Sequence, residues 1–232
     1  MSLALYDRTA DAVRDLYDRR IQEAPVLSER RFFPQAHLFR ENWQDIRDEA
    51  AGISEGRLAA IPRFHELMEE QKEISANDGR DWRLFILKAY GREWKHNLAR
   101  CPRTAAILAQ CPSVLSASFS FLAPGKHIPE HRGPFRGVVR FHLGLSMPRK
   151  ADGKLGAVLW VDGEPHYLDD GGTLLWDDTY PHEVLNATDG VRVALLLDVW
   201  RANMPADLRA LSSLIVGFVR TAMLFRPSYT NA

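Results

Sequence analysis

The sequence has only two cysteines, no excess of charge of either sign and no long apolar run. Its 30 basic and 30 acidic side chains cancel to a formal net charge of zero, so we expect no nucleic-acid partner. Cys101 and Cys111 fall at the ends of a predicted helix, about 15 Å apart at ~1.5 Å rise per residue, which is too far for a disulfide. Reduced thiols of this kind are typical of a cytoplasmic protein.

The sequence also predicts neither a signal peptide at residues 1–20 nor a membrane-spanning segment. Residues 1–20 carry charges where a signal peptide needs an apolar core. No run of about 18 or more uncharged apolar residues occurs. We therefore expect a cytoplasmic protein, in which any membrane contact would be peripheral and on the inner face.

The length of 232 residues is typical of a single domain, here expected over residues 1–232. Residues 1–112 predict a mostly helical support region, because apolar residues recur at spacings of three and four over 6–22, 36–52 and 56–74. Within this region a strand is expected over 81–91 and a helix over 102–111.

A C-terminal amphipathic helix is predicted over residues 205–226. Its apolar stripe consists of Leu208, Leu211, Ile215, Phe218, Ala222 and Phe225. Packing against the domain or against a second subunit, as in a homodimer, is one interpretation. The other is a helix on a membrane surface, where four arginines would meet anionic head groups: Arg201, Arg209, Arg220 and Arg226.

Residues 114–201 predict the β core. Short apolar runs with a period of two are separated by turn signals at Asp152-Gly153, Asp162-Gly163, Gly171-Gly172 and Asp189-Gly190. Strands at such regular spacing indicate a jelly roll with flanking helices, so the fold class is mainly β.

Two histidines in bends of this core are candidate metal ligands. His131 lies between the turn at Pro124-Gly125 and the bend at Gly133-Pro134, and His182 follows Pro181 after a predicted strand. A usual iron-binding facial triad has a carboxylate two residues after its first histidine, but Gly133 occupies that position here. Asp178 could complete the coordination or hold a metal-bound water. We exclude His127 from the metal ligands and expect His166 to be solvated.

Polar residues at alternate strand positions form a second group. Arg192 faces away from the apolar side of its strand, so its guanidinium could pair bidentately with a dicarboxylate, and the Ser120 hydroxyl could add a contact. A structural ion pair of Arg192 with Asp198 or Asp178 is the alternative. Arg140 and His142 share one strand face by the period of two.

Four motifs together resemble the aspartyl/asparaginyl β-hydroxylase family of iron(II)- and 2-oxoglutarate-dependent oxygenases. They are Ser120-x10-His131-Arg-Gly-Pro, Arg140-Phe-His142-Leu-Gly-Leu, Asp177-Asp178-x3-His182-Glu-Val and Arg192-x5-Asp198-Val-Trp, within residues 114–201. The resemblance implies a double-stranded β-helix of the cupin type. It further implies that His131 and His182 bind iron, while water replaces the carboxylate missing at Gly133 and Asp178 holds water nearby.

The same resemblance implies the co-substrates and the reaction. Arg192 with Ser120 would hold the distal carboxylate of 2-oxoglutarate, and Arg140 with His142 would contact its metal-bound end. Dioxygen would then be consumed, with release of succinate and CO2, to hydroxylate an aspartyl or asparaginyl side chain, an amino acid or a related small substrate. A lipid A acyl chain is the alternative substrate, and a non-catalytic module that binds a metal or a small acid is the alternative function.

Overall fold

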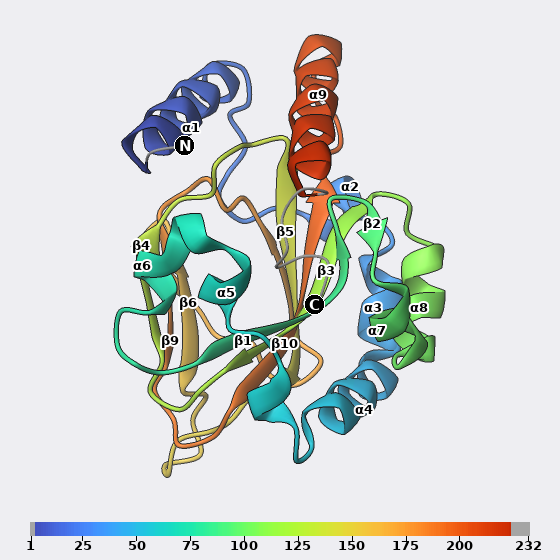
Figure 1. Cartoon of the computed structure of the whole chain (residues 1–232), viewed down its shortest axis with the longest axis vertical. Coiled ribbons are helices and arrows are strands. Elements are labelled where there is room, and N and C mark those ends of the chain that lie inside the picture. The colour runs from blue at the N-terminus through green and yellow to red at the C-terminus, as the bar shows by residue number, and fades with distance from the viewer. Residues whose placement is uncertain (1–2, 224–232) are drawn as a thin grey trace.

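The computed structural model describes residues 3–223, whose elements are drawn in Figure 1. The helices, with η for short 3-10 turns, are α1 (Leu3–Asp18), α2 (Glu29–Phe32), α3 (Ala36–Glu41), α4 (Trp43–Ser54), η1 (Leu58–Ala60), α5 (Phe64–Leu67), η2 (Glu69–Gln71), α6 (Lys72–Ser75), α7 (Lys95–Ala99), α8 (Pro102–Ala109) and α9 (Ala206–Met223). The strands are β1 (Trp82–Ala89), β2 (Arg92–Glu93), β3 (Val114–Leu122), β4 (His127–His131), β5 (Val138–Ser146), β6 (Ala157–Val161), β7 (Glu164–His166), β8 (Thr173–Trp176), β9 (His182–Asn186) and β10 (Arg192–Trp200).

Two antiparallel sheets form a cupin-like jelly roll, which confirms the predicted fold class. The major sheet has six strands in the order β2-β1-β3-β10-β5-β8, and the minor sheet has four in the order β4-β9-β6-β7. β1 and β2 belong to the major sheet although they precede residue 114. The barrel therefore begins inside the region that the sequence predicted to be helical support.

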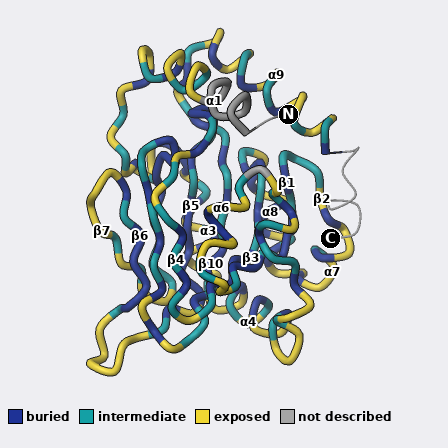
Figure 2. The backbone as a smooth tube through the Cα atoms, turned by 60° about the vertical axis from the view of Figure 1, so that its left-hand side comes forward, coloured by how far each residue is buried: buried dark blue, intermediate teal, exposed yellow. Residues whose placement is uncertain are grey.

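The major sheet separates two apolar cores. One of its faces packs against the N-terminal helices, and this core includes Phe33, Phe39, Ile46, Phe119, Phe141, Leu143, Leu195 and Leu197. The other face and the minor sheet enclose a smaller core that includes Trp82, Leu122, Leu159, Val161, Trp176 and Val184. Figure 2 shows how much of β3, β5 and β10, which lie between the two cores, is buried.

The helical region over residues 36–75 consists of shorter helices than its periodicity predicted. The run over 36–52 divides into α3 and α4, which Asn42 separates. The run over 56–74 is not one helix but the short elements η1, α5, η2 and α6. The backbone explains this correction, because the Pro62 carbonyl accepts a hydrogen bond from Leu84 and Arg63 forms a β-bridge with Arg83. Pairing with β1 thus competes with helix formation at a proline.

α9 follows the predicted C-terminal helix, but its packed face is narrower than predicted. Leu208, Val216 and Met223 are buried. In contrast, Phe218 is 76% exposed and Leu214 is 72% exposed. Phe218 lies about 200° around the helix from Val216, which turns it to the outside. Phe225 and Arg226 lie outside the described residues. Within residues 3–223, no helix is both long and apolar enough to cross a membrane. A membrane-surface role and a dimer contact for α9 stay predictions.

Both cysteines are free and buried. Burial raises the pKa of the Cys101 thiol to about 12 and that of the Cys111 thiol to about 11. Because the thiolate is the reactive form of cysteine, these side chains are inert packing groups at neutral pH.

Candidate functional site

The two candidate metal ligands face each other on neighbouring strands of the minor sheet. His131 is the last residue of β4 and His182 is the first residue of β9, and the antiparallel register pairs them directly. Their ring centroids are 4.0 Å apart, with an interplanar angle of 55°. Two bends that are distant in the sequence therefore meet at one end of the barrel.

Backbone carbonyls select the same tautomer of both imidazoles. The Nδ1–H of His131 donates to the Pro129 carbonyl at 2.8 Å, and the Nδ1–H of His182 donates to the Tyr180 carbonyl at 3.0 Å. Since a carbonyl can only accept, each Nε2 keeps its lone pair for a metal ion. Burial lowers the pKa of His131 to about 4 and that of His182 well below its ordinary value, so both rings are neutral at pH 7.

Asp178 fills the space where a side chain on residue 133 would lie. A Cβ atom added to Gly133 would be 2.4 Å from Oδ1 of Asp178 and 2.5 Å from its Cγ. The Gly133 amide also donates to the Asp178 carbonyl at 2.6 Å. The loop before β9 thus supplies a carboxyl group at the place where the usual triad carries its acid. Burial raises the pKa of this group to about 6, and its Oδ1 has no hydrogen-bond partner among the described residues.

Arg140 is paired with two carboxylates. Its Nε and Nη2 donate to Oδ1 of Asp198 at 3.0 and 2.9 Å, and Nη2 lies 3.2 Å from Oδ2 of Asp178. Burial alone would lower the pKa of Arg140, but these carboxylates raise it above its ordinary value. Asp198 lies directly opposite Arg140 on β10. The two acids that sequence reasoning offered as partners for Arg192 are therefore engaged by Arg140.

Arg192 is a buried cation for which residues 3–223 supply no partner. Its side chain begins β10 and is 5% exposed. No hydrogen bond or ion pair reaches its guanidinium from the part of the chain that the structure describes, and burial alone lowers its pKa to about 10. Ser120 lies on the adjacent strand β3 and accepts a hydrogen bond from Trp82 Nε1 at 3.0 Å. An isolated charge in such a place is costly unless an anion joins it.

His142 is a buried histidine on β5 that is close enough to Arg192, Arg140 and His182 for their charges to act on it. Burial lowers its pKa well below the ordinary value, and the charges of Arg192, Arg140 and His182 lower it further. Its Nδ1 is buried without a hydrogen-bond partner among the described residues. Its ring meets the Trp176 ring edge-on at 5.4 Å, and Trp176 meets His182 at 4.7 Å. His142 therefore presents an unused nitrogen within the same interior.

A cleft of about 170 Å³ gives access to the histidine pair, and Asp178 and Arg140 also line it. Another part of its wall is apolar and comes from α5 and β1, through Phe64, Leu67, Trp82, Leu84 and Ile86. Ser120, His142 and Arg192 are not among the residues that line this cleft. Arg192 instead lines a smaller cavity beside His166.

The residues present offer two facing imidazoles to a metal ion. Within residues 3–223, no group of three or more histidine, cysteine, aspartate or glutamate side chains is arranged to hold a metal ion. The candidate centre thus offers two imidazole nitrogens and the nearby Oδ1 of Asp178, which has no hydrogen-bond partner among the described residues. Imidazole with oxygen ligands and open positions suits iron(II).

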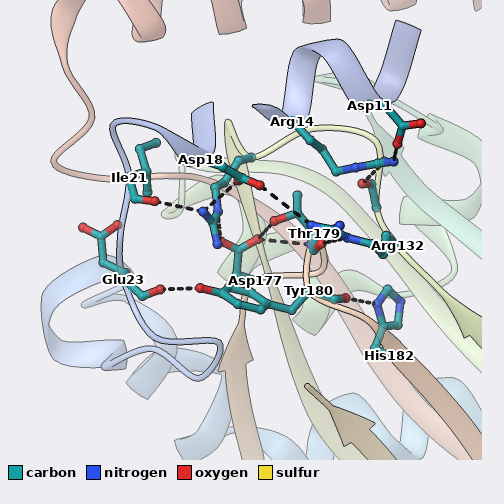
Figure 3. A network of polar contacts seen from close by, with 12 residues as sticks. Asp11, Arg14, Asp18, Ile21, Glu23, Arg132, Asp177, Thr179, Tyr180 and His182 are labelled. Atoms are coloured by element: carbon teal, nitrogen blue, oxygen red, sulfur yellow. Dashed lines mark hydrogen bonds and ion pairs between the residues drawn. The ribbon is translucent and has the colours of Figure 1, made fainter. Parts of the chain in front are cut away.

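Several contacts around the site were not predicted. Asp198 was offered as a partner of Arg192 but pairs with Arg140, which lies opposite it on the neighbouring strand. His166, which we expected to be solvated, is half-buried, and its Nε2 is buried without a hydrogen-bond partner among the described residues. His127, which we excluded, bonds Glu183 at 2.9 Å. A buried ion network around Asp177 borders the site (Figure 3) and has no signal in the sequence.

Residues 40–202 match the family model described as Aspartyl/Asparaginyl beta-hydroxylase. Among curated proteins, the chain is 37% identical over 174 residues to the ornithine lipid ester-linked acyl 2-hydroxylase of Rhizobium tropici. The aligned region covers 75% of this chain and 60% of that protein. It is 28% identical over 179 residues to the human aspartyl/asparaginyl beta-hydroxylase, and this alignment covers 75% of this chain and 22% of that protein. The chain thus spans less than two thirds of the length of either relative.

Solved structures show a weaker likeness. A cupin domain of an XRE family transcriptional regulator from Enterobacter cloacae is 16% identical, with a TM-score of 0.35, and covers 51% of this chain and 96% of that one. This likeness is too weak to support an inference about function.

Proposed function

The chain belongs to the aspartyl/asparaginyl beta-hydroxylase family, and from this premise we propose that it is an iron(II)- and 2-oxoglutarate-dependent hydroxylase. The observation that carries the proposal is the facing pair of imidazoles, His131 and His182, both held by backbone carbonyls through Nδ1. Iron(II), with 2-oxoglutarate and dioxygen as co-substrates, would supply the oxidising power for hydroxylation of a C–H bond.

The protein's own part at the metal is to fix the ligands and one carboxyl group. His131 and His182 would ligate through Nε2, and their carbonyl contacts keep the rings from turning. Asp178 would either ligate the metal or accept a hydrogen bond from a metal-bound water. Its orphan Oδ1 supports both roles.

The co-substrate explains the unpaired cation. The distal carboxylate of 2-oxoglutarate would neutralise Arg192, with Ser120 as a second donor, and its other end would approach Arg140 and His142. The absence of any partner for Arg192 among the described residues supports this role, because a purely structural arginine would have a carboxylate beside it. Trp82 and Trp176 line the interior and help to keep water away from the reacting centre.

Turnover of the co-substrate tests the proposal. Purified protein with iron(II) and ascorbate should convert 2-oxoglutarate to succinate, and His131→Ala should abolish this conversion. Anaerobic addition of 2-oxoglutarate to the iron(II) protein should produce a visible charge-transfer band. A non-catalytic module that binds a small acid away from the metal would give neither the succinate nor the band, and that pair of results would refute the proposal.

For the substrate, we propose an aliphatic chain of an acylated amino acid or lipid. The apolar part of the cleft wall, in which the Phe64 and Trp82 rings stack at 3.8 Å, favours methylene groups over a charged side chain. The R. tropici relative, named as an acyl 2-hydroxylase, supports the same choice. An aspartyl or asparaginyl side chain, the substrate in the family's name, is the second candidate, because Arg140 also lines the cleft.

A substrate panel separates these candidates. Succinate formation would be measured with an ornithine lipid, lipid A, an aspartyl peptide and free aspartate, and hydroxylated products would be identified by mass spectrometry. Stimulation by an acylated substrate alone is the expected result. Stimulation only by the peptide or free aspartate would reverse the choice of substrate while leaving the proposed chemistry intact.

A further inference from the structure

Asp177 and Asp178 are neighbours in the sequence, but their carboxyl groups have different surroundings. Asp178 lines the cleft with the histidine pair, whereas the Asp177 carboxylate is fully buried in an ion network that reaches Asp18 and Ile21 of the N-terminal segment (Figure 3). Arg136 Nε donates to its Oδ2 at 2.7 Å, and Arg201 Nη2 donates to the same oxygen. Its Oδ1 accepts the Thr179 hydroxyl at 2.6 Å and the Thr179 amide at 3.1 Å. Both oxygens of Asp177 are therefore saturated.

The two arginines continue outward from Asp177. Arg136 Nη1 donates to Asp18 at 2.8 Å and to the Ile21 carbonyl at 2.9 Å. Arg201 Nε donates to the Arg136 carbonyl at 2.7 Å. Asp18 and Ile21 lie before residue 40, where the family match begins, while the arginines lie within it. The network thus joins the C-terminal end of α1 and the residues after it to the loop that carries Asp178 and His182.

Hydrogen bonds also join this loop to Arg132 and Gly133, the two residues that follow His131. The Gly133 amide donates to the Asp178 carbonyl at 2.6 Å, and Arg132 Nε donates to the Thr179 carbonyl at 2.6 Å. Each residue of the loop from 177 to 180 therefore has a fixed partner, and Tyr180 in turn holds Nδ1 of His182.

We propose that Asp177 is a positioning residue of the metal centre, which acts through the loop 177–182 without touching metal or substrate. Removing its charge would leave Arg136 and Arg201 as buried neighbouring cations, whose remaining carboxylate partners among the described residues are Asp18 and Glu23. The loop would then lose its anchor, and Asp178 and His182 would move relative to His131. The proposal rests on the proposed function, since it presumes that these residues surround a metal ion.

Cobalt(II) binding tests this role without turnover, because the visible spectrum of the ion reports its coordination geometry. We compare wild type with Asp177→Asn and with a matched control, Asp78→Asn. Asp78 likewise pairs with a buried cation, because its Oδ1 lies 2.7 Å from Nζ of Lys126, and it accepts hydrogen bonds from two backbone amides. These contacts lie at the end of β4 opposite His131. Thermal unfolding of all three proteins is recorded alongside the spectra.

Asp177→Asn should weaken cobalt(II) binding about 10- to 100-fold, the range for residues that orient metal ligands, and alter the spectrum of the saturated protein. Asp78→Asn should lower the unfolding temperature but keep the affinity and spectrum of wild type. Should Asp177→Asn not fold, Thr179→Val decides by the same titration, because it removes the side-chain hydrogen bond by which Asp177 holds the loop and keeps both ion pairs.

Wild-type affinity and spectrum in the decisive variant would overturn the positioning role. An equal loss of affinity in Asp78→Asn would do the same, since the effect would then be general destabilisation. Failure of the wild-type protein to bind cobalt(II) would instead refute the proposed metal centre, so the two failures are distinguishable.

Discussion

The two faces of the major sheet use alternate residues of the same strands, yet they differ in how their groups are satisfied. Toward the N-terminal helices, the strands present Phe119, Phe141, Leu143, Leu195 and Leu197, all at 0% exposure. Toward the barrel interior, they present serines, histidine and charged residues, several of which have no partner within the described residues. The first face contributes stability, and the second carries the groups that we propose a ligand satisfies.

Two buried arginines, Arg83 and Arg192, illustrate this difference between the two faces of the major sheet. Arg83 lies on the helix-covered face, where it donates to Asp81 and to the carbonyls of Ala59 and Ile61. Arg192 is buried to a similar degree on the interior face, with 5% exposure against 8% for Arg83. Burial alone lowers the pKa of Arg192 to about 10. A cation with all its partners is structural, whereas one without partners indicates a binding site for an anion.

The largest effect is expected on the apolar face. Phe141→Ala removes a ring that meets Phe33 at 5.4 Å and Phe39 at 6.1 Å. It should cost about 3–5 kcal/mol of unfolding free energy, measured by urea denaturation. Ser118→Ala, on the cleft side of β3, is the control and should change stability little. A loss below about 1 kcal/mol for Phe141→Ala would contradict the assignment of this face as the main core.

On the interior face, Arg192→Met should separate binding from stability. Loss of a charge-assisted pair should weaken 2-oxoglutarate binding by about 1.5–3 kcal/mol, or roughly 10- to 150-fold, measured by titration of the charge-transfer band. The ligand-free protein should become more stable, by on the order of 1 kcal/mol, because a buried unpaired charge is removed. Unchanged affinity would remove Arg192 from the co-substrate site.

Arg83→Met should give the opposite pattern. Because Asp81 and two carbonyls would lose their donor, the variant should lose about 1–3 kcal/mol of unfolding free energy. Its affinity for 2-oxoglutarate should equal that of wild type. If both methionine variants behaved alike, the distinction between the two faces would fail.

The smallest effect is expected in the acid range. Burial alone would raise the pKa of Asp81, but the hydrogen bond and charge of Arg83, with the charge of Arg63, hold it below 3.8. A lowered carboxyl pKa stabilises the folded protein above pH 3.8, and this contribution is lost as pH falls through the folded pKa. It is below about 1 kcal/mol, because solvent screens this partly exposed group.

Urea titrations between pH 5 and pH 2.5 would measure this contribution. It should shrink in Arg83→Met, where only Arg63 remains beside Asp81 at 2.8 Å. In Arg192→Met it should match wild type, since that arginine has no acidic partner among the described residues. An equal change in both variants would count against the pairing of Arg83 with Asp81.

The fold class was predictable because strand periodicity is a local property. Alternation in β3, β5 and β10 identified which residues share a face, and the structure places Arg140, His142 and Arg192 opposite the apolar core as expected. The helical run over 56–74 was not predictable in the same way. Its apolar spacing is helical, but pairing of Pro62 and Arg63 with β1 broke it, and that pairing depends on a distant strand.

The sequence by itself determined the residue types at the site, the strand faces that carry them and the family they resemble. Only the tertiary structure decided which of these side chains contact each other. It places the carboxyl group of Asp178 beside Gly133, pairs Asp198 with Arg140 and not with Arg192, and puts Asp177 between two arginines. The reason is physical. Periodicity specifies the direction of a side chain relative to its own strand, whereas an ion pair or an orphan charge depends on the distance between strands and loops that are far apart in the chain.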